Sequence, residues 1–241
     1  MKIFQKAFGG TNALLFLDLE GTGATHEVIE IGATLVTIDE KAFAKKVFPF
    51  FRTFVKAKGE ITSIVTKMTG ITEEKLKKEA ISFDEAILLL KKYSGKYWPS
   101  LKVVTFGKHD AVMLNSSSTM DAKETVIEVR NILKKTIDFQ GFLSKYIKDP
   151  NGNSYSLVNY LKVFKLEFKG QEHDASFDAY NLYRLYEKAI KSPDIFVEEY
   201  KKSLLKNKAL TPPLKRLIQT LISGNAVTPN MLNDSIKETF K

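Results

Sequence analysis

A short apolar run, residues 13–19 (ALLFLDL), ends at the turn sequence Gly21-Thr22-Gly23. A run of this length with a glycine stop predicts a buried β-strand. Asp18 and Glu20 lie at its end, and because side chains alternate along a strand, both carboxylates lie on one face. Neighbouring anions repel each other unless a cation lies between them. The pair is compatible with a solvated strand end or with a functional site.

Two β-rich stretches that follow predict further strands nearby. Residues 28–37 are β-branched and residues 46–55 are rich in aromatic side chains. Pro49 places the second stretch at a sheet edge or at a strand start, and the short connections favour an antiparallel meander. Residues 102–106 and 136–139 predict two more strands between helical segments. We therefore expect an α/β fold with a mixed sheet flanked by helices.

Capping residues predict where several helices begin and end. Ser82 and Glu85 form a capping box, and Thr69-Gly70 ends a short helix over residues 60–68. Helical periodicity covers residues 109–134 with an interruption at 115–118, and residues 139–147, 156–166 and 175–190. A Ser or Thr cap before proline starts each of three short C-terminal helices, at Ser192-Pro193, Thr211-Pro212 and Thr228-Pro229.

The charge balance favours a polyanionic partner. The 241 residues include 37 Lys and Arg against 28 Asp and Glu, a formal net charge of +9, which suits nucleic acid or phospholipid. The chain has no cysteine, which excludes disulfides, a thiol nucleophile and thiolate zinc sites, and suits a reducing compartment. No stretch approaches the ~18 apolar residues of a membrane span. We expect a soluble cytoplasmic protein with no membrane partner.

Three further polar residues lie at or near helix starts. Asp110 follows the strand 102–106 and opens the next helix, where an acid is ordinary because it favours the helix dipole. Asp178 falls on the apolar stripe of the helix 175–190, where a carboxylate needs a partner. His173 lies just before that helix. Alone, each has an ordinary structural explanation.

Taken in order, these residues resemble the DEDDh branch of the DnaQ-like, RNase T-like 3′–5′ exonucleases, which have a ribonuclease H-like fold. The resemblance rests on three motifs, FLDLEGTG (16–23), VVTFGKHD (103–110) and HDASFDAYN (173–181), and on the intervening segments IEIGA (29–33) and KMTGIT (67–72). It covers residues 12–191 and implies a five-stranded mixed sheet flanked by helices. Residues 192–241 lie outside it as a C-terminal helical extension.

The sequence departs from the family pattern at three places. Gly21 stands where the family usually has Thr, and Phe106 where many ribonuclease members have Trp. Residues 174–177 replace the more usual Arg-Ala-Leu-Asp. None of these changes removes an expected metal ligand or the histidine.

The resemblance implies a role for each motif residue. Four carboxylates are expected to be catalytic and to hold two Mg²⁺ or Mn²⁺ ions: Asp18, Glu20, Asp110 and Asp178. His173 is expected to be the catalytic general base, a task that suits an imidazole near neutral pH.

The resemblance also implies residues that bind the terminal nucleotide. Glu20, Thr22 and Gly23 are expected to surround the 3′-OH. Ile71 and Phe106 are candidates to pack on the last bases, because stacking tolerates any sequence. Both are equally compatible with ordinary core positions.

The leading hypothesis is a 3′–5′ exonuclease that releases 5′-mononucleotides from single-stranded nucleic acid, with RNA favoured over DNA. The alternative is a DNA exonuclease or a polymerase proofreading subunit, because residues 192–241 could dock on a protein partner. An inactivated exonuclease fold used as a binding module ranks lowest, because all four carboxylates and the histidine are present.

Overall fold

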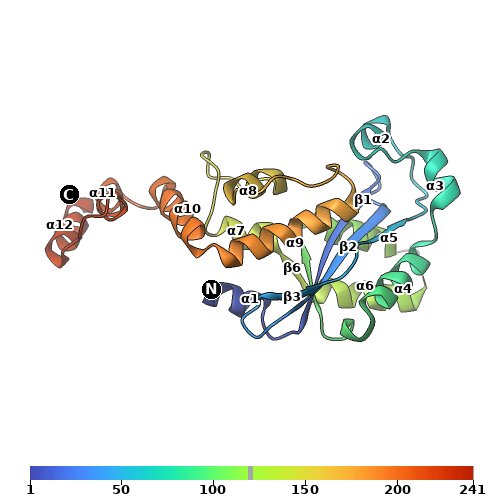
Figure 1. Cartoon of the computed structure of the whole chain (residues 1–241). Helices are drawn as coiled ribbons and strands as arrows, with labels where there is room; N and C mark the ends of the chain where they lie inside the picture. Colours follow the sequence, from blue (N-terminus) through green and yellow to red (C-terminus); the bar gives the residue numbers. More distant parts are fainter. Residues whose placement is uncertain (119–121, 241) are drawn as a thin grey trace.

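The structure is a computed structural model that describes residues 1–118 and 122–240. Within these residues a mixed sheet is covered by helices on both faces (Figure 1). Its six strands are β1 (Ala13–Gly21), β2 (Val28–Ile38), β3 (Ala44–Val47), β4 (Phe51–Phe54), β5 (Lys102–Thr105) and β6 (Thr136–Asp138). Their order is β3-β2-β1-β5-β6, with β4 also paired to β2. The predicted α/β class is confirmed.

The described part of the sheet has six strands rather than five because the expected strand over residues 46–55 is divided. β3 pairs with the end of β2, where Val47 lies opposite Val36. β4 pairs nearer its start, where Phe54 lies opposite Glu30. Pro49 lies between the two strands, and a residue without an N–H cannot continue the ladder.

The helices follow the capping signals closely. They are α1 (Lys2–Phe8), α2 (Ser63–Thr69), α3 (Glu73–Glu79), α4 (Phe83–Ser94), α5 (His109–Ser118), α6 (Lys123–Lys134), α7 (Phe139–Ser144), α8 (Leu157–Val163), α9 (Ala175–Lys191), α10 (Pro193–Lys206), α11 (Pro212–Ile222) and α12 (Pro229–Thr239), with a 3₁₀ turn at Gly95–Tyr97. Gly70 ends α2 in the left-handed region, and the Ser82–Glu85 capping box forms. The expected break at residues 115–118 comes later, because α5 continues through Ser118.

Strand β1 separates two apolar cores. Leu14 and Phe16 face a core built with α1, α7, α8 and α9, whereas Leu15 and Leu17 face a core built with α4, α5 and α6. Asp18 continues the face of Leu14 and Phe16, so its carboxylate lies on the side of the sheet that α9 covers. This alternation confirms the predicted common face of Asp18 and Glu20.

Three aromatic residues outside the expected domain limits, Phe4, Phe8 and Phe196, complete the α9-side core. Phe4 of α1 is fully buried, and its ring centroid lies 5.0 Å from that of Phe142. Phe196 of α10 is 4% exposed and lies 6.0 Å from Phe4. The sequence analysis expected neither a helix at α1 nor core residues beyond 191. The division at residue 191 stays a prediction.

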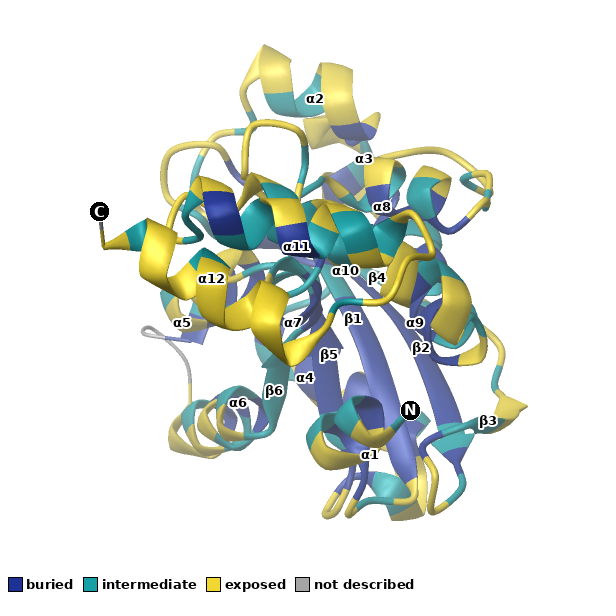
Figure 2. Cartoon of the chain, turned by 90° about the vertical axis from the view of Figure 1, so that its left-hand side faces the viewer, coloured by how far each residue is buried: buried dark blue, intermediate teal, exposed yellow. Residues whose placement is uncertain are grey.

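The last two helices lie at one end of the molecule, away from the sheet (Figure 1). α11 packs against α10 and α12. Figure 2 shows that α12 is largely exposed, whereas α10 and α11 contain many partly buried residues. No helix in the described ranges is both long and apolar enough to cross a bilayer.

A glycine in β2 sets how closely α9 approaches the sheet. A Cβ atom on Gly32 would lie 2.0 Å from the backbone carbon of Ala175 and 2.2 Å from the nitrogen of Ser176. Only a residue without a side chain allows the first turn of α9 to rest on β2. This contact brings the start of α9 next to the end of β1.

We expect Gly32→Ala to lower the free energy of unfolding by about 1–3 kcal/mol, as an overpacked buried position does. Because α9 would have to move away from the sheet, activity should fall as well. Urea denaturation monitors the stability. Thr37→Ala, in the same strand, should cost less than about 1 kcal/mol. Equal losses in both variants would show that the close approach at Gly32 has no special role.

Candidate active site

The five residues singled out by the sequence motifs meet in one cavity beside the end of β1. Asp18 and Glu20 come from β1, Asp110 from the first turn of α5, Asp178 from the first turn of α9, and His173 from the loop before α9. The cavity has a volume of about 550 Å³. Residues from three separate parts of the chain therefore form one site, as expected.

Backbone N–H groups fix two of the carboxylates. The N–H of Leu19 donates to Oδ1 of Asp110 at 3.1 Å, and Asp110 is only 4% exposed. The N–H of His173 donates to Oδ2 of Asp178 at 2.9 Å. His173 has a φ of 64°, in the left-handed region that histidine adopts more often than most residues. The positions of Asp110 and Asp178 thus depend on the backbone of the neighbouring motifs.

The imidazole of His173 is the most accessible of the catalytic groups. Its side chain is 46% exposed, and Nδ1 lies 3.9 Å from Oε1 of Glu20. Glu20, His173 and Asp178 each offer a ligand atom within 4.8 Å of the others. The structure therefore contains a possible metal site made of two carboxylates and one imidazole.

Burial and mutual repulsion raise the pKa values of the clustered acids. Burial, followed by the charges of Asp110 and Asp178, raises the pKa of Asp18 well above its usual range. Burial and the charge of Asp178 raise the pKa of Glu20 to about 8. Burial also raises the pKa values of Asp110 and Asp178 to about 7, although backbone N–H groups oppose the shift. Near neutral pH the metal-free site retains protons.

The donor set fits hard divalent cations. Among the described residues, no lysine or arginine lines the cavity, so no permanently charged cation of the described lining neutralises the acids. Carboxylate oxygens are the ligands that Mg²⁺ and Mn²⁺ prefer. A divalent cation would relieve the repulsion that raises these pKa values.

An ion network, which we call the α9 anchor, holds the start of α9. It consists of Glu30, Arg52 and Asp174. Arg52 pairs with the fully buried Glu30, and its Nη1 lies 2.7 Å from Oδ2 of Asp174. Oε2 of Glu30 accepts from the N–H of Ala175 at 3.2 Å, while Oδ1 of Asp174 accepts from the N–H of Ser176 at 3.1 Å.

The α9 anchor was missed in the sequence analysis. Glu30 did carry a signal, because it is an acid inside the otherwise apolar run of β2. Its partner Arg52 comes from β4, and nothing local connects the two. The anchor satisfies N–H groups at the start of α9, next to His173 and Asp178.

The expected nucleotide-binding residues do not all reach the cavity. Glu20 and Phe106 line it. Thr22 is 3% exposed and its hydroxyl accepts from the N–H of Glu27, whereas Gly23 is exposed outside the cavity lining. Ile71 is fully buried in a small apolar core with α3. Of the two candidates for base packing, only Phe106 faces the site.

The cavity also has walls that no sequence motif indicated. The start of α8 contributes Ser156–Asn159, and α5 contributes Met113. His109, from the second motif, also lines the cavity. Met113 explains one departure from the family pattern, because a Cβ atom on Gly21 would lie 2.4 Å from its sulfur. The space that a threonine side chain would need is occupied by Met113.

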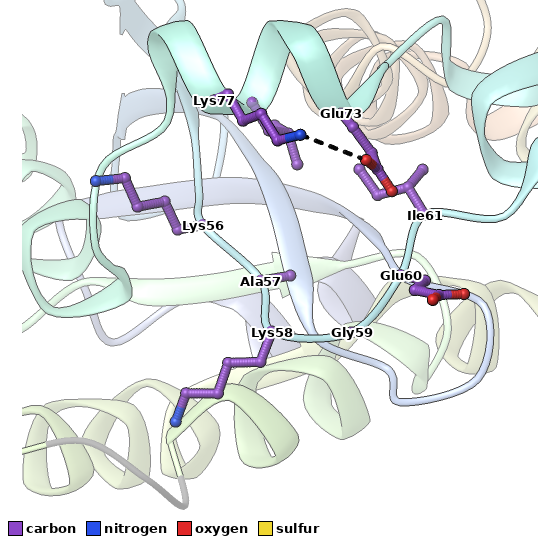
Figure 3. Close-up of a pocket in the computed structure, with 9 residues that line it drawn as sticks. Lys56, Ala57, Lys58, Gly59, Glu60, Ile61, Glu73 and Lys77 are labelled. Carbon is purple, nitrogen blue, oxygen red and sulfur yellow. Dashed lines mark ion pairs between the residues drawn. The ribbon is translucent and has the colours of Figure 1, made fainter.

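A second cavity, of about 430 Å³, lies apart from the catalytic residues. It opens between the loop 56–61 and α3 (Figure 3). In it Nζ of Lys77 lies 3.8 Å from Oε2 of Glu73. None of the five motif residues lines it, so it adds no group to the site.

Comparison with known proteins decides the family. The family model RNase_T, described as an exonuclease, matches residues 15–186. The chain belongs to this exonuclease family. The match and the meeting of the five residues confirm the resemblance to the DEDDh 3′–5′ exonucleases inferred from the sequence.

Two solved structures with a similar fold contain different nucleotide ligands. The nuclease domain of 3′hExo, a DEDDh family member bound to rAMP, superimposes with a TM-score of 0.61 at 17% identity, over 77% of this chain and 95% of that one. Exonuclease I of E. coli in complex with a dA16 oligonucleotide superimposes with a TM-score of 0.57 at 15% identity, over 81% of this chain and 45% of that one.

One curated relative is far longer than this exonuclease. The PolC-type DNA polymerase III of Caldanaerobacter subterraneus subsp. tengcongensis is 28% identical over 174 residues, or 71% of this chain. The matched segment spans only 11% of that polymerase.

We expect the metal-free exonuclease to lose stability as the pH rises from about 5 to about 8. A carboxylate whose folded pKa is raised contributes stability below its unfolded pKa, and this is lost as the pH passes the folded pKa. The folded values of about 7 and 8 at Asp110, Asp178 and Glu20 set the upper end of this window. Asp18→Asn should stabilise the metal-free protein at pH 7.5, because burial and the neighbouring acids disfavour the charged form of Asp18.

Thermal unfolding in chelator across this pH range measures both effects. Glu60→Gln, which changes an exposed acid outside the site, should leave the pH profile as in the wild type. A metal-free stability that rises between pH 5 and pH 8, or a destabilised Asp18→Asn, would contradict the repulsion.

Proposed function

We propose that this exonuclease removes nucleotides one at a time from the 3′ end of single-stranded nucleic acid, releases 5′-mononucleotides, and prefers RNA. The observation that carries the proposal is the meeting of four carboxylates and one imidazole in a single cavity. Its volume of about 550 Å³ is in the range of sites for small organic ligands, which suits a terminal nucleotide.

We propose that the carboxylate cluster holds two Mg²⁺ or Mn²⁺ ions. The ligands would be Asp18, Glu20, Asp110 and Asp178. When bound, the ions would supply positive charge to the phosphate during cleavage. Four acids with raised pKa values and the absence of lysine and arginine from the described cavity lining support this assignment.

His173 is proposed to be the general base. A water molecule attacks the last phosphorus atom, the bond to the 3′ oxygen of the preceding nucleotide breaks, and His173 takes the proton of the water. The exposed imidazole beside Glu20 is accessible to such a water. Phe106, in the cavity wall, is proposed to pack on the terminal base.

The preference for RNA is the finer part of the proposal. Its support is the likeness to the 3′hExo nuclease domain bound to rAMP, 95% of which is covered. The second candidate is a DNA exonuclease associated with a polymerase, which the match to a PolC-type DNA polymerase favours. Both use the same catalytic cavity and differ in the sugar that they accept.

We further propose that residues 12–191 form the exonuclease domain and that residues 192–241 could dock on a protein partner. α12 supports this because it exposes Leu232 and Ile236, and Phe240 after it is 84% exposed. The lack of cysteine supports a cytoplasmic location.

We expect the exonuclease to degrade RNA and DNA oligomers of identical sequence only when Mg²⁺ or Mn²⁺ is present. It should shorten these oligomers only from a free 3′-OH. RNA should be degraded faster than DNA. Denaturing gels of 5′-labelled oligomers measure the polarity and the preference. A circular oligomer is the control and should stay intact. Full activity in excess chelator would overturn the metal assignment, and faster cleavage of DNA would select the second candidate.

We expect His173→Ala to reduce single-turnover cleavage by about 10²–10⁴-fold, the usual contribution of a general base. Mn²⁺ binding, measured by calorimetry, should persist because all four carboxylates remain. His109→Ala removes the other histidine of the cavity wall and should lose less than about tenfold. Similar losses in the two variants would mean that His173 is not the base.

A further inference from the structure

We propose that a groove between the loop after α7 and the end of α10 binds the phosphate backbone of the substrate strand upstream of the terminal nucleotide. We call it the basic groove and define it by Lys145, Lys148, Lys206 and Lys208, with Tyr146 and Tyr200 in its wall. The inference extends the proposed function, because it assumes a nucleic-acid strand in the catalytic cavity.

The charge of the basic groove is uncompensated. Its volume is about 530 Å³, and no carboxylate is among its lining residues within the described ranges. None of the four lysines has an acidic oxygen within 4.0 Å in the part of the chain that the structure describes. Four unpaired ammonium groups around one hollow suit a polyanion.

The preceding turn of α10 shows the opposite arrangement. Lys201 pairs with Glu198 at 2.6 Å, and Lys202 pairs with Glu199 at 2.6 Å. The same helix therefore neutralises its central lysines but presents Lys206 without an ion pair to the groove. The positive charge is concentrated at the end of α10 that faces the α7–α8 loop.

The basic groove is continuous in sequence with the catalytic cavity. Lys145, Lys148 and Gly152 line both the groove and a neighbouring cavity of about 460 Å³. That cavity extends to Ser154, and residues 156–159 line the catalytic cavity. The fully buried Tyr160 packs beneath this segment and connects it to the cavity wall, because its ring centroid lies 5.3 Å from that of Tyr155 and 6.1 Å from that of Phe106. A strand whose 3′ end is in the catalytic cavity can thus continue along this segment.

Hydrogen bonds hold the loop wall of the groove in place. The N–H of Lys148 donates to Oγ of Ser203 on α10 at 3.1 Å. Oδ1 of Asp149 accepts from the N–H groups of Asn151 at 2.9 Å and Asn153 at 2.7 Å. The carboxylate of Asp149 therefore accepts hydrogen bonds within its own turn, while Lys145 and Lys148, which precede it, line the groove without an ion pair.

The groove wall suits nucleic acid better than an acidic peptide. The rings of Tyr146 and Tyr200 lie 5.7 Å apart in an edge-to-face contact next to the lysines. Lysines with neighbouring aromatic rings are the usual means of holding a single strand without regard to its sequence. The polyanion would also be the one already held at its 3′ end by the catalytic cavity.

The test replaces Lys145, Lys148, Lys206 and Lys208 by Gln in the full chain. Binding is measured without metal, in an Asp18→Asn background, by fluorescence anisotropy of an RNA of about 20 nucleotides, longer than the ~4–16 that one single-strand-binding fold occupies. We expect about a tenfold or larger rise in Kd. The slope of log Kd against log salt should fall by roughly 3, at about 0.7 per phosphate contact.

A matched variant controls for charge alone. It replaces four exposed lysines on β3, α4 and α6, which do not line the groove: Lys45, Lys92, Lys123 and Lys134. An equal loss in this variant would show non-specific attraction and overturn the proposal. An unchanged Kd in the groove variant would also overturn the proposal. So would binding of polyglutamate to the groove that leaves the affinity of the protein for RNA unchanged.

Cleavage of a dinucleotide separates this proposal from the proposed function. A dinucleotide has only one nucleotide beyond the terminal one, and no residue lines both the catalytic cavity and the groove. With Asp18 unchanged, the groove variant should therefore cleave a dinucleotide as the wild type does. A parallel loss on the dinucleotide would mean a damaged active site and would count against the groove. If no variant cleaves any substrate but the lysines still govern RNA binding, the proposed function fails and the groove stands.

Discussion

Repulsion among four buried carboxylates is the constraint around which the structure is arranged. Burial and mutual charge raise the pKa values of Asp18, Glu20, Asp110 and Asp178. Such a cluster persists only where the surrounding fold imposes it, as strained functional sites require. Here the imposing elements are the period of β1, which places two of the acids on one face, and backbone N–H groups that hold the other two.

The α9 anchor holds the clustered acids in place and also adds to the repulsion among them. Arg52 pairs with Glu30 and Asp174, and these three residues hold the start of α9, next to His173 and Asp178. The anchor carries two acids and one base, so its own charge is negative. Glu30 and Asp174 accordingly add to the rise in the pKa of Glu20. The fold thus gives up metal-free stability to create a site that attracts cations, a common relation between stability and activity.

Sequence signals predicted what is local and failed where contacts are distant. The shared face of Asp18 and Glu20 follows from strand geometry, and the cap at Ser82 follows from residues three positions apart. The α9 anchor joins Glu30 to Arg52 across two strands, and α1 is a seven-residue helix stabilised by aromatic packing rather than by its own sequence. The sequence also does not show whether an apolar residue outside the strands faces the core or the cavity. Ile71 lies in the core, whereas Phe106 faces the cavity.

The opposite signs of the catalytic cavity and the basic groove have a physical reason. A nucleic-acid strand is repelled by the acidic cavity, so its terminal phosphate can enter only when cations neutralise the carboxylates. Lysines inside the cavity would pair with those acids and displace the cations that the chemistry requires. Lysines at the end of α10 attract the strand without this competition, because the catalytic acids are not among the residues that line the groove. The net charge of +9 is therefore compatible with an acidic active site: attraction of the strand and cleavage of its end are assigned to separate surfaces.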